Sequence, residues 1–310
     1  MTDLPFVTLD VFTETPFTGN PLAVFPAGEH VPEALMPRIA AELNLSETVF
    51  VLPAVRPGSA ARLRIFTPTI EMPFAGHPVV GTTVALAQAG RFGPFADRVE
   101  VVLDLEAGPA PVTVERVPGG LVRATLTTPR QPVPLPATTD RAVLAALLGL
   151  PAEALAAEVE PGGFGAGVPF TIIPLASAEA LAAARLDLGV WRDRIAGTAA
   201  PHVHVVFMED WRTGRDIRAR MFAPAMGIAE DPATGAAAAA LAGWLADRQR
   251  HDAGTASWTI RQGVEMGRPS TIGLSADLRD GRTTAVRIGG TAVAVGRGAV
   301  LAAAVQNTAM

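Results

Sequence analysis

The segment HPVVGTTVAL, residues 77–86, has a counterpart in DPATGAAAAA, residues 231–240. Three further pairs of segments match in the same order, with nearly constant offsets: GNPLAVFP (19–26) with GVPFTIIP (167–174), RIAAELNLSETVFV (38–51) with RIAGTAAPHVHVVF (194–207), and RIFTP (64–68) with RMFAP (220–224). An internal repeat of this kind is typical of two structural units built on one plan.

The repeat predicts an α+β protein of two pseudo-symmetric domains, residues 1–128 and 129–294. Each half is expected to run strand, helix, strand, strand and small-residue helix, with a curved sheet wrapped around the last helix. The proline-rich segment 128–140 is expected to connect the halves, because repeated prolines favour extended backbone. The alternating segment 287–305 is expected to form closing strands, with turns at its glycines.

Both segments of the opening pair are typical of helix starts, because proline is favoured at the first helical position. His77 and Asp231 would then be the N-cap residues. Aspartate is a favoured N-cap and histidine is not, so capping accounts for Asp231 but leaves His77 unexplained. The helices that follow are small and apolar on nearly every face, which predicts burial. Two such helix starts brought together would form a pocket for a carboxylate, flanked by His77 and Asp231.

Glu47 follows NLS and begins an apolar run, ETVFVL. Under the two-residue period of a strand it shares a face with Val49 and Val51. A carboxylate that faces a core needs a polar partner or a functional role that accounts for its burial. Burial would raise its pKa toward a value useful for acid–base catalysis, whereas a solvated place at the strand edge is the alternative. Its counterpart in the repeat is placed at about His204. His202 and His204 have the spacing of possible metal ligands, although no third ligand follows nearby.

The composition excludes several classes of protein. The 310 residues are 49% hydrophobic with a net charge of −5, which predicts a large core and argues against nucleic acid as a partner. The sequence has no cysteine, lysine or tyrosine, which excludes thiolate chemistry, Schiff bases and a P-loop lysine. The N-terminus does not resemble a signal peptide, and no segment is long and apolar enough to span a bilayer. We therefore expect a cytoplasmic protein without a membrane partner.

Five segments together resemble the PhzF-type, phenazine-biosynthesis-like isomerases: LDVFTETPFTGNPLAVF, NLSETVFV, RIFTPTIEMPFAGHPVVGTT, EDPATGAAAAAL and QGVEMGRPS. The resemblance covers nearly the whole chain. It implies a diaminopimelate-epimerase-like fold, an active site in the cleft between the domains, no cofactor or metal, and a homodimer. It also implies that the end of the chain, about residues 295–310, completes the first domain.

The resemblance also implies roles for single residues. Glu47 would be the acid–base residue, and His77 and Asp231 would hold or polarise the substrate. Substrate-binding positions would be Asn20, Ser46, Gly76, Thr234, Gly235 and Ala236. In the phenazine enzyme a serine stands where this chain has Ala236, and the missing hydroxyl removes a hydrogen-bond donor. A different substrate, or a different way of holding the same one, is therefore expected.

The function expected from these observations is a cofactor-independent isomerase that moves a proton on a small carboxylate-bearing molecule related to dihydro-hydroxyanthranilate. Two alternatives stay open. One is a small-molecule-binding homologue that has lost catalysis, which the Ala236 substitution favours. The other is a cysteine-free epimerase or racemase that uses Glu47 and His77 as its acid–base pair.

Overall fold

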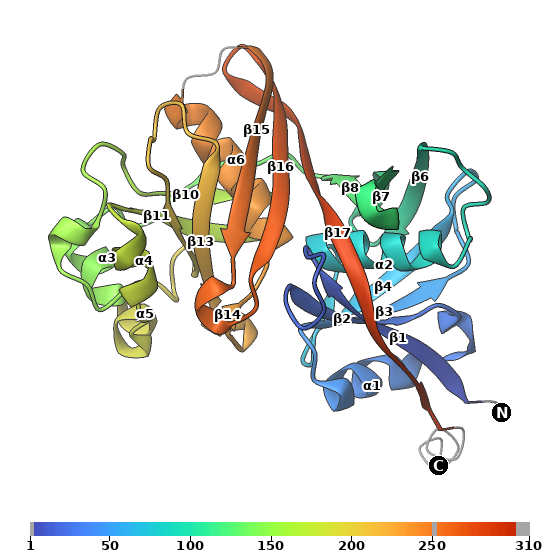
Figure 1. Cartoon of the computed structure of the whole chain (residues 1–310). Helices are drawn as coiled ribbons and strands as arrows, with labels where there is room; N and C mark the ends of the chain where they lie inside the picture. The colour runs from blue at the N-terminus through green and yellow to red at the C-terminus, as the bar shows by residue number, and fades with distance from the viewer. Residues whose placement is uncertain (1–2, 250–252, 302–310) are drawn as a thin grey trace. The chain divides into compact units, whose positions relative to one another are not determined.

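The computed structural model describes residues 3–249 and 253–301, and its contacts divide the chain into two compact units (Figure 1). Unit 1 comprises Met1–Pro129 together with Gly289–Met310, and unit 2 comprises Arg130–Ile288. Residues 302–310, part of the predicted completion of the first domain, lie outside the described residues. None of the helices in the described ranges is long and apolar enough to cross a membrane.

Unit 1 is a β-rich structure whose strand pairings close into a ring. Around the ring β17 pairs with β1, β1 with β2, β2 with β3, β3 with β4, β4 with β6, β6 with β7, β7 with β8, and β8 with β17. The β2–β3 and β4–β6 pairs are parallel. The elements are β1 (Leu4–Val11), β2 (Asn20–Phe25), α1 (Met36–Leu43), β3 (Glu47–Leu52), β4 (Ala61–Phe66), β5 (Glu71–Met72), α2 (Gly76–Gln88), β6 (Arg98–Leu105), β7 (Gly108–Val117) and β8 (Leu121–Thr127), with short 3-10 turns at Gly28–His30, Glu33–Leu35 and Pro118–Gly120. Strand β17 (Arg282–Val300) belongs to unit 1 from Gly289 onward, and its first residues belong to unit 2.

Helix α2 is the centre of unit 1. It contacts β1, β2, β3, β7 and β8, strands that come from different parts of the ring, and ten of its thirteen residues are buried. The small apolar sequence explains this burial, because a helix without a polar face cannot lie on the surface. The predicted order of strand, helix, strand, strand and small-residue helix is confirmed here as β2, α1, β3, β4 and α2.

Unit 2 repeats this order and adds helices outside the sheet. Its strands pair in the order β9–β10–β11–β12–β13, and β13 pairs further with β14 and β15, while β15 pairs with β16. The elements are β9 (Val133–Leu135), α3 (Arg141–Leu147), β10 (Gly162–Gly165), β11 (Pro169–Leu175), α4 (Ala178–Ala183), α5 (Leu188–Arg194), β12 (His202–Phe207), β13 (Asp216–Ala223), β14 (Ile228–Asp231), α6 (Gly235–Gln249), β15 (Ala253–Gln262) and β16 (Ser270–Arg279), with 3-10 turns at Ala152–Ala154, Pro224–Met226 and Val264–Met266.

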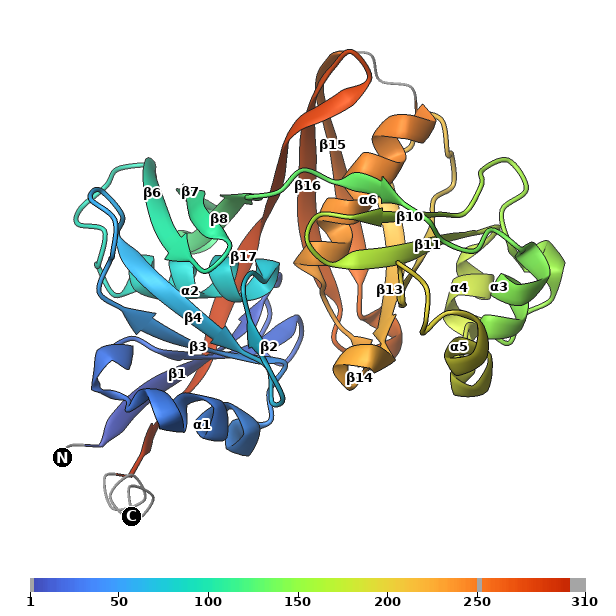
Figure 2. The ribbon, with the colours of Figure 1, turned by 180° about the vertical axis from the view of Figure 1, so that it is seen from behind.

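Two separate groups of helices pack against the sheet of unit 2. Helix α6 contacts β9, β10, β11 and β16, and its residues are buried from Gly235 to Ala246. Helices α3, α4 and α5 gather apart from α6 (Figure 2) and share a hydrophobic core with Ile173 and Leu175 of β11 and with Val203 and Val205 of β12. Alternation along β12 therefore directs His202 and His204 away from that core.

The predicted N-cap roles of His77 and Asp231 are wrong. Helix α2 begins at Gly76 with Ala75 as its N-cap, so His77 lies inside the first turn. This turn tolerates Pro78 because the first four helical N–H groups have no partner within the helix. In unit 2 Asp231 ends strand β14, and α6 begins four residues later at Gly235. Neither side chain is therefore explained by helix capping.

Strand β17 also differs from expectation. The sequence predicted several closing strands with turns at glycines, but residues Arg282–Val300 form one strand of 19 residues. A Cβ atom added at Gly290 would lie 2.4 Å from Phe12 Cδ1, and one added at Gly298 would lie 2.7 Å from Phe6 Cζ. Aromatic rings therefore pack closely against the backbone at these glycines. Such close packing is a reason for glycine within a strand that does not involve a turn.

The proline-rich segment 128–140 is extended as predicted, but it is also part of a sheet. Its residues Val133–Leu135 form β9, which pairs antiparallel with β10 through Gly163↔Leu135 and Gly165↔Val133. Among the described residues β9 has pairings with β10 alone. An edge position of this kind accommodates Pro134, because a proline cannot donate to a second neighbouring strand.

Gly81 provides a test of the packing in unit 1. A Cβ atom at Gly81 of α2 would lie 2.5 Å from Val11 Cγ2 and 2.7 Å from Leu22 Cδ2, both fully buried side chains. We expect Gly81→Ala to lower the free energy of unfolding by about 1–3 kcal/mol, because overpacking outweighs the better helix propensity of alanine. Urea unfolding followed by circular dichroism measures this change. Gly197→Ala is the matched control, since nothing lies within 4 Å of an added Cβ there, and an equal loss in both variants would contradict the packing explanation.

Candidate functional site

Three buried polar side chains meet in unit 1, and we call them the imidazole cluster: Asn20, Glu47 and His77. Asn20 begins β2, Glu47 begins β3 and His77 lies in the first turn of α2. The His77 Nε2 atom lies 3.1 Å from Glu47 Oε2, and the Asn20 Nδ2 atom lies 3.3 Å from His77 Nδ1. The structure therefore brings together three residues that the sequence had placed in the site, from segments far apart in the chain.

The strand β3 directs Glu47 toward the interior. Val49 and Val51 on the same face are 0% and 2% exposed, and Glu47 itself is 9% exposed. Glu47 sits opposite Leu22 in the parallel β2–β3 pair, beside the strand that carries Asn20. The solvated strand-edge position, the alternative weighed for Glu47, is therefore excluded.

His77 is uncharged at neutral pH. Burial lowers the pKa of the His77 imidazole to about 3, although a hydrogen bond to the backbone of Pro21 opposes part of this shift. The short distance between His77 and Glu47 is therefore a contact of a neutral imidazole with a carboxyl group rather than an ion pair, since an ion pair would need the protonated ring. A neutral imidazole beside a carboxyl group can share or pass a single proton, as acid–base chemistry requires.

A second polar cluster lies in unit 2, and we call it the aspartate cluster: Asp231, Thr234 and Gln262. The Thr234 hydroxyl donates to Asp231 Oδ2 at 2.5 Å. The Gln262 amide donates to the Asp231 carbonyl at 2.7 Å and to Thr234 Oγ1 at 3.0 Å, while its Oε1 accepts from the Thr234 N–H at 3.4 Å. The amide of Gln262 therefore fixes the segment that leads from β14 into α6.

Gln262 was missed by the sequence analysis. It ends β15 and is almost completely buried, and it is followed by Gly263 with a φ of +77°. A Cβ at Gly263 would lie 2.6 Å from the Pro232 carbonyl, so the turn after β15 closely approaches the segment that carries Asp231. The available signal was the QGVEMGRPS segment, which is part of the family resemblance but to which the sequence analysis assigned no site residue.

The remaining predicted positions lie beside the two clusters in the sequence. Ser46 is half-buried in the bend before β3, and Gly76 is the buried first residue of α2. Gly235 and Ala236 are the first two residues of α6, and both are buried. Whether these positions and both clusters line one cleft stays a prediction.

The register of the strands corrects the counterpart of Glu47. Leu22 and Phe170 are matched in the repeat, and Leu22 pairs with Glu47 whereas Phe170 pairs with His202. Both Glu47 and His202 are also the first residues of six-residue strands. The counterpart is therefore His202, and the prediction of His204 is displaced by two residues.

His202 and His204 do not complete a metal site with other side chains. No group of three or more His, Asp or Glu residues in the described ranges could hold a metal ion. His204 is fully buried, and neither of its ring nitrogens has a hydrogen-bond partner among the described residues. Burial lowers the pKa of the His204 imidazole to about 3 and lowers that of His202 in the same direction.

The burial of His204 predicts a pH dependence of stability. Since its folded-state pKa lies below the unfolded value near 6.5, only the unfolded chain takes up a proton as the pH falls below about 6.5. We expect His204→Leu to reduce the stability lost between pH 7 and pH 5 by about 2 kcal/mol. Tryptophan fluorescence in urea measures this change, because all four tryptophans lie in unit 2. Parallel pH profiles of variant and wild type would contradict the explanation.

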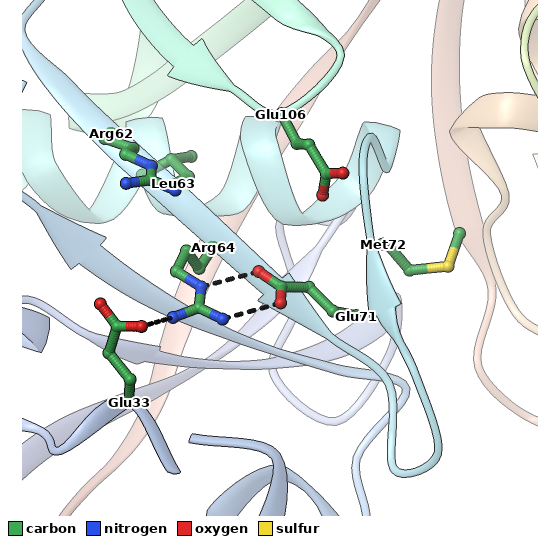
Figure 3. Close-up of a pocket in the computed structure, with 7 residues that line it drawn as sticks. All are labelled: Glu33, Arg62, Leu63, Arg64, Glu71, Met72 and Glu106. Carbon is green, nitrogen blue, oxygen red and sulfur yellow. Dashed lines mark hydrogen bonds and ion pairs between the residues drawn. The ribbon is translucent and has the colours of Figure 1, made fainter. Parts of the chain in front are cut away.

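A polar pocket of about 220 Å³ lies elsewhere in unit 1 and shares no residue with the imidazole cluster (Figure 3). Of its two arginines, Arg64 makes two hydrogen bonds of 2.7 Å to Glu71, and a second carboxylate, Glu33, lies 3.3 Å from the same guanidinium. Because three glutamates line the pocket beside these two arginines, it is a poor place for a substrate carboxylate. The imidazole and aspartate clusters stay the better candidates.

Comparisons with known proteins agree with the resemblance seen in the sequence. The family described as phenazine biosynthesis-like protein matches residues 9–298. An uncharacterised isomerase of Mesorhizobium japonicum is 40% identical over 298 residues, which cover 94% of this chain and 97% of that protein. A trans-2,3-dihydro-3-hydroxyanthranilate isomerase of Pseudomonas fluorescens is 36% identical over 298 residues, covering 96% of this chain and 99% of that protein.

The fold is also found in solved structures. A PhzF-family phenazine biosynthesis protein of Bacillus anthracis superposes with a TM-score of 0.84 at 23% identity, covering 97% of this chain and 100% of that one. This likeness shows a shared mixed α+β fold. Together with a family match over most of the sequence and relatives of 36–40% identity over nearly its whole length, it shows that the chain belongs to the phenazine biosynthesis-like family and is an isomerase of the PhzF type.

Proposed function

We propose that this isomerase moves a proton on a small carboxylate-bearing substrate of the dihydro-hydroxyanthranilate kind, with Glu47 as the acid–base group on a diaminopimelate-epimerase-like fold. The observation that carries the proposal is the buried contact of 3.1 Å between Glu47 and His77. A carboxyl group kept from water beside a neutral imidazole is poised for proton transfer. The 36% identity to a trans-2,3-dihydro-3-hydroxyanthranilate isomerase supports the substrate class.

The reaction needs no external oxidant or reductant. Glu47 accepts a proton as a C–H bond of the substrate breaks, and the electron pair moves into the adjacent unsaturated system. Glu47 then delivers a proton, either the abstracted one or one exchanged with solvent, to another carbon, so the substrate loses one proton and gains one and its atoms and electrons balance. His77 holds Glu47 in place and polarises the substrate during this transfer.

The aspartate cluster is proposed to bind the substrate. Gln262 and Thr234 hold Asp231, and the N–H groups at the start of α6, near Gly235, are suited to a carboxylate. Asn20, Ser46 and Gly76 are proposed to line the same site from their positions near Glu47 and His77. We further propose that the enzyme works as a cytoplasmic homodimer without nucleic acid or membrane partners.

A second candidate function follows from Ala236. This residue is 8% exposed at the start of α6 and offers no hydroxyl to a ligand. A homologue that binds a small carboxylate without turning it over would be compatible with such a loss. The imidazole cluster, which a binding protein would not need, favours the isomerase over this alternative.

The test is to incubate the protein in D2O with trans-2,3-dihydro-3-hydroxyanthranilate and with a panel of small unsaturated carboxylates. The proposal expects an isomerised product that carries deuterium at carbon, measured by NMR and mass spectrometry. Binding detected by calorimetry without deuterium exchange would favour the binding homologue instead. A product of unchanged connectivity and inverted configuration would identify a racemase.

A further inference from the structure

The loop that joins β1 to β2 leads directly into the imidazole cluster. Its residues 12–19 end at Asn20, and the antiparallel register of the two strands pairs Asp10 with Pro21. The Asn20 side chain contacts the His77 imidazole at 3.3 Å, and the backbone of Pro21 is hydrogen-bonded to the same ring. The loop is therefore anchored on the strand segment that also holds His77.

Phe17 in this loop is held by a buried carboxylate. Its N–H donates to Asp10 Oδ2 at 2.6 Å, and Asp10 is 3% exposed. Paired residues on antiparallel strands have Cα atoms about 4.5–5.5 Å apart, so Asp10 lies beside Pro21. Phe17 and His77 are thus hydrogen-bonded to the two members of one cross-strand pair. Phe17 also precedes Asn20 by three residues, so their Cα atoms lie within about 11 Å of each other. One small ligand can therefore contact Phe17 and the imidazole cluster together.

The loop is also stiffened by hydrogen bonds of its own. The Thr15 N–H donates to Thr13 Oγ1 at 3.1 Å, and the Thr18 hydroxyl donates to the Thr15 carbonyl at 2.7 Å. The Thr291 hydroxyl donates to the Thr13 carbonyl at 2.9 Å, which ties the loop to β17. The position of Phe17 is therefore set by the fold of unit 1.

Phe17 is unusual in both its backbone and its exposure. Its φ of +68° lies in the left-handed region, which costs free energy for a bulky residue and which glycine adopts freely. Phe17 is nevertheless 76% exposed, so its side chain gains little from burial to offset this cost. Packing within unit 1 therefore does not account for a phenylalanine at this position.

We propose that Phe17 is a specificity-determining residue whose ring packs on the flat, unsaturated ring of a carboxylate substrate bound at the imidazole cluster. The inference rests on the proposed function and adds to it a preference for cyclic over acyclic unsaturated carboxylates. Aromatic rings pack on other π systems in offset-stacked or edge-to-face contacts, which contribute free energy beyond the burial of area. Substrate binding would then bury the exposed ring and offset the cost of the left-handed backbone.

The experiment is calorimetric titration of the full chain with benzoate and with crotonate. Both probes are unsaturated carboxylates, and only benzoate carries a flat ring. Phe17→Ala should raise the Kd of benzoate about 10-fold and that of crotonate less than about 2-fold. An unchanged Kd of benzoate, equal losses for both probes, or no binding of benzoate by the wild type would each overturn the proposal. The titration needs no turnover, so its outcome is separate from whether the proposed isomerisation is observed.

Val55→Ala is the matched control. Val55 is 63% exposed, and its N–H donates to the buried carboxylate of Asp104 at 2.9 Å, so it is held in the same way as Phe17. It follows the end of β3 that is opposite Glu47, about 16 Å along the strand at the usual rise per residue. Its replacement should leave the Kd of both probes unchanged.

A second variant and a second measurement complete the test. Phe17→Leu keeps an apolar side chain without a ring, so its Kd for benzoate should lie between those of the wild type and Phe17→Ala. Sedimentation of the same variants measures their oligomeric state, which should not change. A smaller oligomer in Phe17→Ala with unchanged binding of benzoate would place the ring at an interface between copies of the chain and would refute its role in specificity.

Discussion

Replacing Glu47 by glutamine is expected to lower kcat about 10²- to 10⁴-fold while the protein stays folded. Glutamine keeps the shape of the side chain and its contact distance to His77, but its amide neither accepts nor returns a proton at neutral pH. The effect should fall on kcat more than on KM, because the lost interaction belongs to the transition state. Deuterium incorporation from D2O should fall in the same proportion as turnover.

Glu33→Gln is the matched control for this substitution. It makes the same chemical change in the same unit, at a carboxylate that is 83% exposed and shares no contact with the imidazole cluster. Its kinetics should equal those of the wild type. Normal turnover with normal deuterium uptake in Glu47→Gln would remove Glu47 from the mechanism and leave His77 as the remaining acid–base candidate in unit 1.

The sequence predicted the parts of the molecule that depend on pattern. Periodicity and composition identified the strand that directs Glu47 inward and the buried helix that carries His77. They could do so because the spacing of apolar residues along the sequence indicates which side chains are buried. The contact between these two residues could not be predicted from spacing. It depends on the parallel register of β2 and β3 and on the place of α2 within the ring, which are tertiary properties.

The errors have a common physical cause. A proline in a helix start is compatible with any position in the first turn, so His77 and Asp231 could not be assigned to a cap from the sequence alone. A glycine in a strand pattern is compatible with a turn and equally with a side chain that packs closely against the backbone. This explains why a turn was wrongly predicted at Gly290. Gln262 was missed because a hydrogen bond between residues 28 or more apart leaves no local pattern.

The repeat also places a similar arginine in each unit. Arg64 in RIFTP binds Glu71 of β5 with two hydrogen bonds of 2.7 Å, and Arg220 in RMFAP binds Glu230 of β14 with two of 2.8 Å. The two pairs differ in their surroundings. The Arg64 side chain is 16% exposed and faces a polar pocket (Figure 3), whereas that of Arg220 is 4% exposed. Burial should therefore make the second pair the more costly one to break.

Arg220→Met is expected to lower the free energy of unfolding of unit 2 by about 3–5 kcal/mol. The change leaves Glu230 without its cation and removes donors that reach the Leu181 and Ala184 carbonyls, at 3.1 and 2.7 Å, near the end of α4. Tryptophan fluorescence in urea measures the loss. Arg218→Met on the same strand is the control, because Arg218 is 35% exposed in its pair with Glu265 and should cost about 1 kcal/mol or less. Equal losses of unfolding free energy in both variants would mean that burial does not set the strength of these pairs. The buried position of Arg220 would then not be explained by the stability of unit 2.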